Sequence, residues 1–423
     1  MIKIPRGTAT HLPEGASLRR YTQEVILSTF FDWGYKEVVT PVFEYLDVLS
    51  AGLTSGLLEK SYKFIDRESG KIMLLRPDIT PQVARMVAGI LSIEPKPLRL
   101  CYYGNIFRYE EAHAGREQEI FQVGCELAGS PSPEADAEII ALASETLKKI
   151  RIEDFKIVIG QVNYLYGIIS FIKDSVEQPL SQENEHALKD AFTKKDSGEL
   201  EILLNKIGVA TDSKKNILKL PELFGGEEIF DKAVKISANK VSYEAIMNLQ
   251  EIYSTLCLYG LKDNIIFDLC DIREIDYYTG IFFEIFSPGI PFPIGRGGRY
   301  DNLIGRFGYD CPSTGFAIDI ESIITVREKQ GEREHINDKP AYLISGGEKE
   351  KKEIIQLARD LRDKGYRSIL DTGLKDLHSI TDYAKNNNIN KIILIDANNS
   401  KQLSIIDVDT MKKTSINKDK LIS

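Results

Sequence analysis

The chain has 423 residues, a hydrophobic content of 43%, a charged content of 28% and a formal net charge of −9. This length exceeds one compact core and predicts two or three domains, while the composition is that of an ordinary globular protein. The acidic balance argues against general nucleic-acid binding, because phosphate neutralisation requires clustered lysine and arginine.

The first 150 residues predict helices alternating with short strands. The N-terminus, MIKIPRGTATHLPEGA, has no apolar signal region, and no later run reaches the roughly 20 apolar residues that span a bilayer, so a cytoplasmic protein without membrane association is expected. After an extended LPEGA turn, residues 18–34 repeat apolar side chains at helical spacing and end at Gly34, a typical C-cap. Strands are predicted at 72–77, 98–109 and 118–128, and an amphipathic helix at 132–150.

Residues 165–262 predict a helical insertion, because they are rich in lysine, glutamate and asparagine and lack strong strand patterns. Strands resume at 265–269 and 278–286, a turn-rich segment follows at 289–308, and GFAIDIESI at 315–323 has the pattern of a strand running into a helix. Consecutive strands joined by short turns predict an antiparallel sheet flanked by helices in an α+β domain, and exclude a doubly wound core.

The charged run at 327–339, REKQGEREHINDK, has no apolar periodicity and predicts a solvated linker. Beyond it, residues 340–423 alternate strand and helix patterns, which predicts a small α/β domain with a mostly parallel sheet. The expected organisation is a core of residues 1–326 that contains the insertion, then the linker, then the C-terminal domain.

Five cysteines and five histidines are dispersed along the chain. The cysteines show no CxxC spacing, so they are expected to be small buried apolar residues that form neither disulfides nor zinc sites. No metal and no other cofactor is expected.

Polar side chains concentrate in four segments: RPDITPQVAR (76–85), FRYEEAHAGREQEIFQVGCE (107–126), DIREIDYYTGIFFE (271–284) and GRGGRYD (295–301). Taken singly, each has a structural explanation, such as a surface arginine, a paired glutamate or a packed tyrosine. Together they can line one pocket in which a carboxylate binds an ammonium, an arginine binds a carboxylate or phosphate, and a second acid takes an imidazole N–H. That chemistry suits a zwitterionic amino acid with a polar ring.

These segments resemble histidyl-tRNA synthetases over nearly the whole chain. RGT…LPEGA and GYKEVVTPVFE are similar to the dimer-forming first motif of class II synthetases, FRYE…GR…FQVGCE to the second motif, and GFAIDIES to the third. RPDITP, R-x-x-DYYTG and GGRYDNL match further stretches of that family. The resemblance implies a class II synthetase-like antiparallel sheet, a homodimer and a C-terminal domain like the anticodon-binding domain.

The departures from the family concern phosphate binding. Active synthetases end the third motif in Glu-Arg, and that arginine binds the γ-phosphate of ATP, whereas here Ser322 follows Glu321. Losing such a cation should cost on the order of 3–4 kcal/mol of transition-state stabilisation. In the second motif Glu111 occupies an arginine position and Asn105 a proline position, although Arg116 remains.

The amino-acid side of the pocket matches the family more closely. By resemblance, Asp78, Thr80 and Gln122 would hold the α-ammonium, and Glu126 and Tyr278 would contact the imidazole of histidine. The full set carried over from the family is Asp78, Thr80, Arg108, Gln122, Glu126, Arg273, Tyr277 and Tyr278.

A histidine pocket without the phosphate-binding cation is typical of the regulatory subunits of ATP phosphoribosyltransferase, which RPDITPQVARMVA and PLRLCYYGNIFRYEEAHAGREQEIFQ resemble more closely than the true synthetases. The resemblance implies a non-catalytic protein that assembles with a short-form catalytic subunit in the first step of histidine biosynthesis and permits feedback inhibition by histidine. An active histidyl-tRNA synthetase is the alternative. A histidine- or tRNA-binding module in translation control is a third hypothesis, although tRNA binding is not expected.

Overall fold

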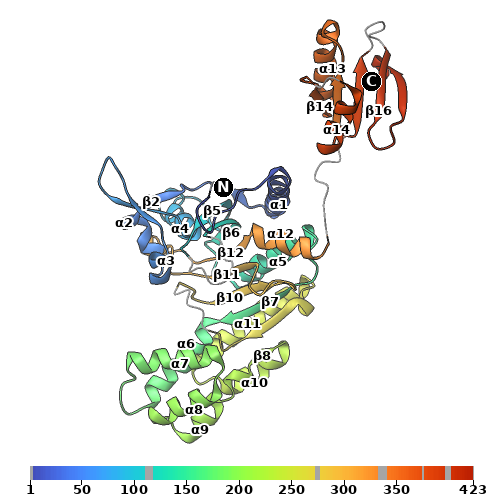
Figure 1. The fold of residues 1–423 in the computed structure, drawn as a ribbon. Coiled ribbons are helices and arrows are strands. Elements are labelled where there is room, and N and C mark those ends of the chain that lie inside the picture. The colour runs from blue at the N-terminus through green and yellow to red at the C-terminus, as the bar shows by residue number, and fades with distance from the viewer. Residues whose placement is uncertain are drawn as a thin grey trace. The chain divides into compact units, whose positions relative to one another are not determined.

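A computed structural model describes residues 3–109, 118–271, 277–331, 341–373, 376–395 and 402–422. The chain divides into two compact units, Met1–Arg333 and Glu334–Ser423 (Figure 1). Each unit has hydrophobic clusters of its own.

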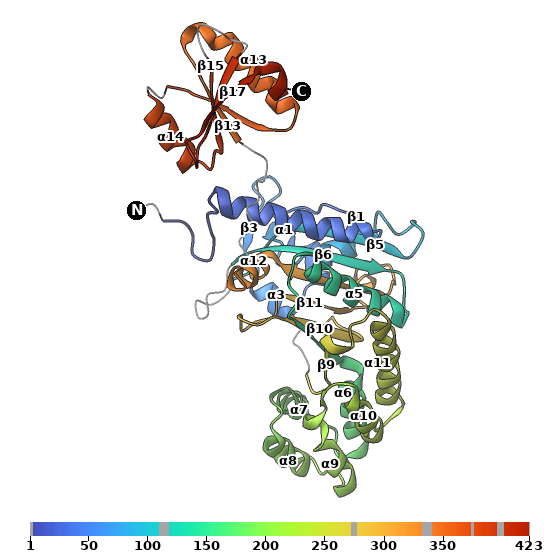
Figure 2. The same cartoon turned by 90° about the vertical axis from the view of Figure 1, so that its right-hand side faces the viewer.

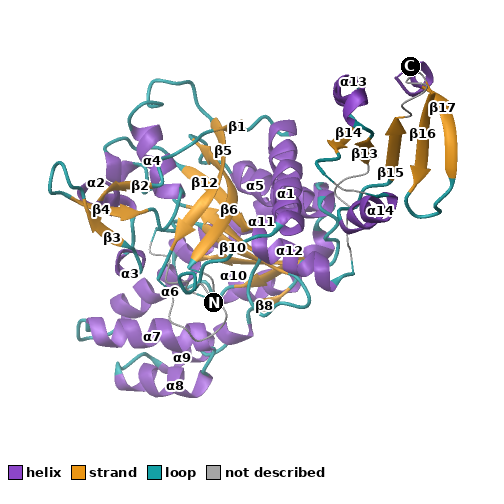
Figure 3. Cartoon of the chain, turned by 45° about the horizontal axis from the view of Figure 1, so that its top comes forward, coloured by secondary structure: helices purple, strands orange, loops and turns teal. Residues whose placement is uncertain are grey.

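A mainly antiparallel sheet forms the centre of the first unit (Figure 3). Its nine strands within the described residues lie in the order β1 (Lys36–Glu37), β5 (Leu98–Phe107), β6 (Glu119–Ala128), β12 (Ser313–Asp319), β11 (Gly295–Arg299), β10 (Ile281–Phe286), β7 (Lys156–Gln161), β9 (Ile265–Asp268) and β8 (Phe224–Gly225). The β1–β5 and β7–β9 pairs are parallel and the other pairs are antiparallel. The predicted antiparallel sheet of an α+β unit is confirmed.

Long helices pack together along this sheet (Figure 2). They are α1 (Pro13–Asp32), α5 (Pro133–Lys149), α11 (Lys240–Leu258) and α12 (Ile320–Lys329). On β6, Val123, Cys125 and Leu127 belong to the hydrophobic cluster with these helices, so the alternate side chains of β6 point to the opposite face. The predicted extended LPEGA turn is wrong, because Pro13 occupies the first position of α1, where its missing N–H costs no helical hydrogen bond.

The predicted insertion is helical, and Figure 1 shows α7 to α9 grouped at one end of the unit. The helices in the predicted range 165–262 are α6 (Val162–Ser175), α7 (Gln182–Lys194), α8 (Ser197–Lys206), α9 (Thr211–Ile217), α10 (Phe230–Ile236) and α11. Of these, α6 begins before residue 165, and α11 packs against α5 beside the sheet. The two-residue strand β8 returns from this segment to pair with β9 at the edge of the sheet.

A small antiparallel sheet follows β1 in the sequence and consists of β2 (Phe43–Tyr45), β4 (Ile72–Leu75) and β3 (Lys63–Ile65). The helices near it are α2 (Leu46–Leu49), α3 (Ser55–Glu59) and α4 (Thr80–Ala88). All five cysteines of the chain are free thiols.

Two central strands, β7 and β11, were not predicted, and β11 lies in the segment that was predicted to be turn-rich. Three of its five residues are glycine, a residue that strands usually disfavour. Here glycine permits close packing, because a Cβ at Gly297 would come within 2.5 Å of the Gly315 carbonyl oxygen and of the Phe283 ring.

The predicted linker begins later than residue 327, because α12 continues to Lys329 and Arg327 is buried. Residues 332–340, which make up most of the predicted linker, lie outside the described residues.

The second unit has a five-stranded sheet, counted over its described residues, in the order β14 (Arg367–Leu370), β13 (Ala341–Ser345), β15 (Lys391–Ile395), β16 (Gln402–Asp407) and β17 (Lys413–Asn417). Its helices are α13 (Lys351–Asp363), α14 (Leu377–Asn386) and α15 (Lys418–Ile422). β13 is parallel to both neighbours, but β16 and β17 add antiparallel pairs, so the expectation of a mostly parallel sheet holds for half of the pairs. Across all the described ranges, every helix is too short or too polar to traverse a bilayer.

Candidate ligand-binding site

A cavity of about 280 Å³ lies on the first unit, on the face of β6 that points away from α1 and α5. Seven of the eight residues predicted for the histidine site line it: Asp78, Thr80, Arg108, Gln122, Glu126, Tyr277 and Tyr278. The eighth, Arg273, lies outside the described residues, as do Glu111 and Arg116. These seven come from three of the four polar segments, and Arg296 and Tyr300 of the fourth line the cavity as well.

Glu126 is buried at one end of this cavity and is held by hydroxyl groups. Thr80 Oγ1 donates to Glu126 Oε1 at 2.7 Å and Tyr102 Oη at 3.3 Å, while Tyr300 Oη contacts Oε2. Burial raises the pKa of Glu126 well above its ordinary value, although the Thr80 and Tyr102 hydroxyls lower it. Thr80 is thus engaged with Glu126 as well as lining the predicted ammonium site.

Asp78 lies beside this cluster with oxygen atoms directed to several neighbours. Its Oδ1 accepts from the Thr80 amide at 3.3 Å, its Oδ2 accepts from Tyr277 Oη at 3.4 Å, and Arg108 Nη2 is 3.9 Å from Oδ2. Gln122 Oε1 is buried and has no hydrogen-bond partner within the described residues. Acceptor atoms on Asp78 and Gln122 are what a bound ammonium group requires.

Three tyrosines form the aromatic wall of the cavity. The Tyr277 ring lies edge-on to Tyr278 at 5.2 Å and to Tyr300 at 5.8 Å between centroids, and Tyr278 stacks on Phe282. Burial raises the pKa of both Tyr277 and Tyr278 above its ordinary value, so their hydroxyls stay protonated. Tyr300 was missed as a site residue, although the GGRYDNL segment that contains it was recognised.

The opposite end of the cavity is formed by the start of α12 and by β11. Ser322 lines it from the first turn of α12, and the neighbouring Glu321 Oε1 pairs with Arg19 Nε at 2.6 Å. Arg296 Nε pairs with Glu284 at 2.9 Å. Counted over the described residues that line the cavity, four carboxyl-bearing side chains stand against two arginines.

Comparison with known proteins identifies the family. The chain is 36% identical over 392 residues to the ATP phosphoribosyltransferase regulatory subunit of Syntrophotalea carbinolica, an alignment that covers 93% of this chain and 90% of that protein. It is also 36% identical to the regulatory subunit of Ruminiclostridium cellulolyticum, over 96% of this chain and 95% of that one. The chain belongs to the family of ATP phosphoribosyltransferase regulatory subunits.

This family shares its fold with histidyl-tRNA synthetases, and the histidyl-tRNA synthetase family model matches residues 7–323. The crystal structure of an ATP phosphoribosyltransferase regulatory subunit/histidyl-tRNA synthetase from Bacillus halodurans superposes with a TM-score of 0.79 at 26% identity, covering 93% of this chain and 98% of that one. The histidyl-tRNA synthetase of Nostoc sp. PCC 7120 gives a TM-score of 0.81 at 20% identity over 100% of this chain and 99% of that one, which shows the fold alone. The predicted class II synthetase-like fold is confirmed.

Proposed function

We propose that the chain is a regulatory subunit of ATP phosphoribosyltransferase that binds histidine in the cavity of its first unit and has no catalysis of its own. One observation carries the proposal: the cavity combines acceptors for an ammonium and an imidazole with Ser322 at the position where active synthetases have an arginine.

The end of the cavity that holds Glu126 suits histidine. Asp78 and Gln122 Oε1, which has no hydrogen-bond partner among the described residues, supply acceptors for the α-ammonium. Glu126, whose pKa is raised by burial, can exchange a proton or a hydrogen bond with an imidazole nitrogen. The tyrosine rings supply an apolar surface for the imidazole plane.

As far as the described residues go, the end of the cavity near Ser322 does not suit a triphosphate. Arg19 and Arg296 are each paired with a glutamate, and Ser322 brings no charge. Triphosphate activation depends on guanidinium or metal groups that offset the charge of the transferring phosphoryl group. The pairing of both arginines and the absence of charge on Ser322 therefore support a protein that does not form histidyl-adenylate.

The proposed partner is a short-form ATP phosphoribosyltransferase catalytic subunit. For histidine to inhibit such a complex, it must bind two states of the complex with different affinity, and coupling of this kind is typically about 1–3 kcal/mol.

We also propose a homodimer. Large apolar side chains around the small sheet are exposed, including Val39 (81%), Phe43 (51%) and Ile65 (68%), as expected of a surface that is covered in an assembly.

The experiment combines assembly, activation and histidine binding. The chain should co-purify with the short-form catalytic subunit of its own organism, raise its turnover and make it sensitive to histidine. Asp78→Asn should weaken histidine binding by calorimetry, whereas Asp174→Asn, at an exposed position on α6, is the matched control and should not. Histidine-dependent ATP–pyrophosphate exchange at a synthetase-like rate would instead identify an active histidyl-tRNA synthetase.

A further inference from the structure

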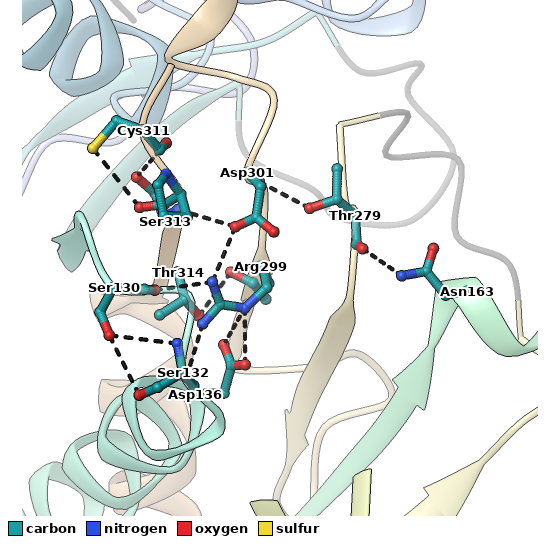
Figure 4. Close-up of polar contacts among 12 residues, drawn as sticks. Ser130, Ser132, Asp136, Asn163, Thr279, Arg299, Asp301, Cys311, Ser313 and Thr314 are labelled. Carbon is teal, nitrogen blue, oxygen red and sulfur yellow. Dashed lines mark hydrogen bonds and ion pairs between the residues drawn. The ribbon is translucent and has the colours of Figure 1, made fainter. Parts of the chain in front are cut away.

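Arg299, the last residue of β11, is buried behind the cavity and does not line it. Its Nε donates to both oxygens of Asp136 on α5, at 3.1 and 2.9 Å. Its Nη1 donates to the Ser130 carbonyl and to Asp301 Oδ1, and its Nη2 donates to the Ser132 carbonyl (Figure 4). All three guanidinium nitrogens are therefore used to fix the end of β11 to the start of α5.

The same network extends to the segment that carries Tyr277 and Tyr278. The Thr279 amide donates to the Arg299 carbonyl at 2.8 Å, and the Asp301 amide donates to Thr279 Oγ1 at 2.8 Å. Figure 4 shows Thr279 between Asp301 and Asn163, whose Nδ2 donates to the Thr279 carbonyl at 2.8 Å. Every polar group of Thr279 is thus bonded, and the residue directly after the tyrosine pair has a fixed position.

Tyr300 lies between the two residues that hold this network. Because side chains alternate along an extended segment, Arg299 and Asp301 point to one side while Tyr300 points to the other, where its hydroxyl meets Glu126. Glycines at 297 and 298 give this end of β11 no side chain of their own. The Arg299 side chain is therefore the main side-chain attachment at the point where β11 delivers Tyr300 to the cavity.

We propose that Arg299 is a positioning residue of the ligand site, which sets Tyr300 against Glu126 and, through Thr279, fixes the Tyr277–Tyr278 pair. The proposal rests on the proposed histidine pocket and adds a requirement for its affinity. Residues that hold a binding group must keep it within about 0.5 Å of its working position, so loosening Arg299 weakens binding even though Arg299 never touches the ligand.

A second ion pair on α5 provides a matched control. Arg99 on β5 makes a two-pronged pair with Glu138, with Nε–Oε1 and Nη2–Oε2 distances of 2.7 Å. This pair also fixes a strand of the same sheet to the same helix, but neither residue lines the cavity. Arg99→Lys therefore reports the stability cost of weakening a strand-to-helix ion pair away from the three tyrosines of the cavity, although Glu138 also accepts from Tyr35.

The test measures histidine affinity and unfolding of the full chain for Arg299→Lys, Thr279→Val and Arg99→Lys. Arg299→Lys keeps the charge but loses the guanidinium fork, and it should raise the Kd for histidine about tenfold or more. Thr279→Val, nearly isosteric, should weaken binding in the same direction and provides the test if Arg299→Lys does not fold. Arg99→Lys should lower the Tm and leave the Kd unchanged.

A double-mutant cycle with Tyr300→Phe separates positioning from stability. If Arg299 acts through Tyr300, Arg299→Lys should have less effect on the Kd when the Tyr300 hydroxyl is already absent. Unchanged Kd values in both Arg299→Lys and Thr279→Val, with wild-type histidine binding intact, would overturn the positioning role and leave the proposed function standing. Full additivity with Tyr300→Phe would overturn the action through Tyr300, and an unchanged Kd in Thr279→Val would overturn the action through Thr279.

The near-ultraviolet circular dichroism of the tyrosines gives a readout without ligand. Arg299→Lys should change this signal in the folded chain, and the change should shrink in the Tyr300→Phe background. Any change in Arg99→Lys, whose partner Glu138 also accepts from Tyr35, should not shrink in that background. If the wild-type chain binds no histidine but shows this pattern, the proposed ligand is wrong and the positioning role stands. If the signal is unchanged as well, both are wrong.

Discussion

Ser322 donates its hydroxyl hydrogen bond to Asp319, with 3.1 Å between Oγ and Oδ2. Asp319 is the N-cap of α12, and its Oδ1 also accepts from the Glu321 amide at 2.9 Å. The serine at the third-motif position is therefore part of a helix cap. Its side chain is directed to its own helix start, and the cavity receives no cation from it.

Removing the cap should destabilise the first unit. Asp319→Ala deletes the acceptor for the amides of Glu321 and Ser322 and for the Ser322 hydroxyl, so the free energy of unfolding should fall by about 1–2 kcal/mol. Ser322→Ala leaves both amide bonds in place and should cost less, about 0.5–1 kcal/mol. Urea unfolding at neutral pH measures both values. An equal loss in the two variants would contradict the cap assignment.

Gly315 on β12 leaves room for the carboxyl group of Glu126 on the neighbouring strand β6. A Cβ at Gly315 would collide with Glu126 Oε2 and come within 2.5 Å of the Cys125 carbonyl oxygen. Gly315→Ala should therefore displace Glu126, lower the free energy of unfolding by about 1–3 kcal/mol and weaken histidine binding. Gly56→Ala in α3, where nothing lies within 4 Å, is the control and should be neutral or stabilising. Normal histidine affinity in Gly315→Ala would show that the Glu126 position is not critical.

Arg76 of the RPDITP segment has a structural role that its motif did not reveal. Its buried guanidinium donates to the Asn105 carbonyl at 2.6 Å and to the Thr40 carbonyl at 3.0 Å, and so joins two segments beside the cavity. Arg76→Met should leave these acceptors without a donor and lower the free energy of unfolding by about 2–3 kcal/mol. The exposed Arg67→Met is the control. Chemical unfolding of both variants checks the difference, and equal stability would contradict this role.

Elements with strong signals in their own residues could be predicted from the sequence, whereas elements that depend on contacts with distant strands could not. The helix predicted at 132–150 is α5, Pro133–Lys149, because proline and acids at its start and a regular apolar face are local signals. β11 could not be predicted in this way, since its glycines are favoured by the close approach of Gly315 and Phe283 on neighbouring strands. Tyr300 was missed for a related reason: its contact with Glu126 joins residues 174 positions apart, and such a contact depends on the strand register.

The raised pKa of Glu126 gives a prediction for the pH dependence of stability. Burial raises the pKa of this carboxyl well above its ordinary value, and the neighbouring Asp78 adds to the effect. Between the unfolded pKa of about 4.3 and the higher folded pKa, the folded chain therefore binds a proton that the unfolded chain has lost. The stability contributed by this proton is fully present below the unfolded pKa and is lost as the pH rises through the folded pKa.

Glu126→Gln cannot titrate, so the free energy of unfolding of the wild type minus that of the variant should decrease steadily as the pH is raised from about 4. Urea unfolding over a pH series measures this difference, and Glu199→Gln, at an exposed position on α8, should give a constant one. The same variant should flatten the pH dependence of histidine binding, because proton release from Glu126 would no longer accompany contact with the imidazole. Parallel stability curves for the wild type and Glu126→Gln would mean that Glu126 is ionised in the folded chain, and that its hydroxyl partners outweigh the effect of burial.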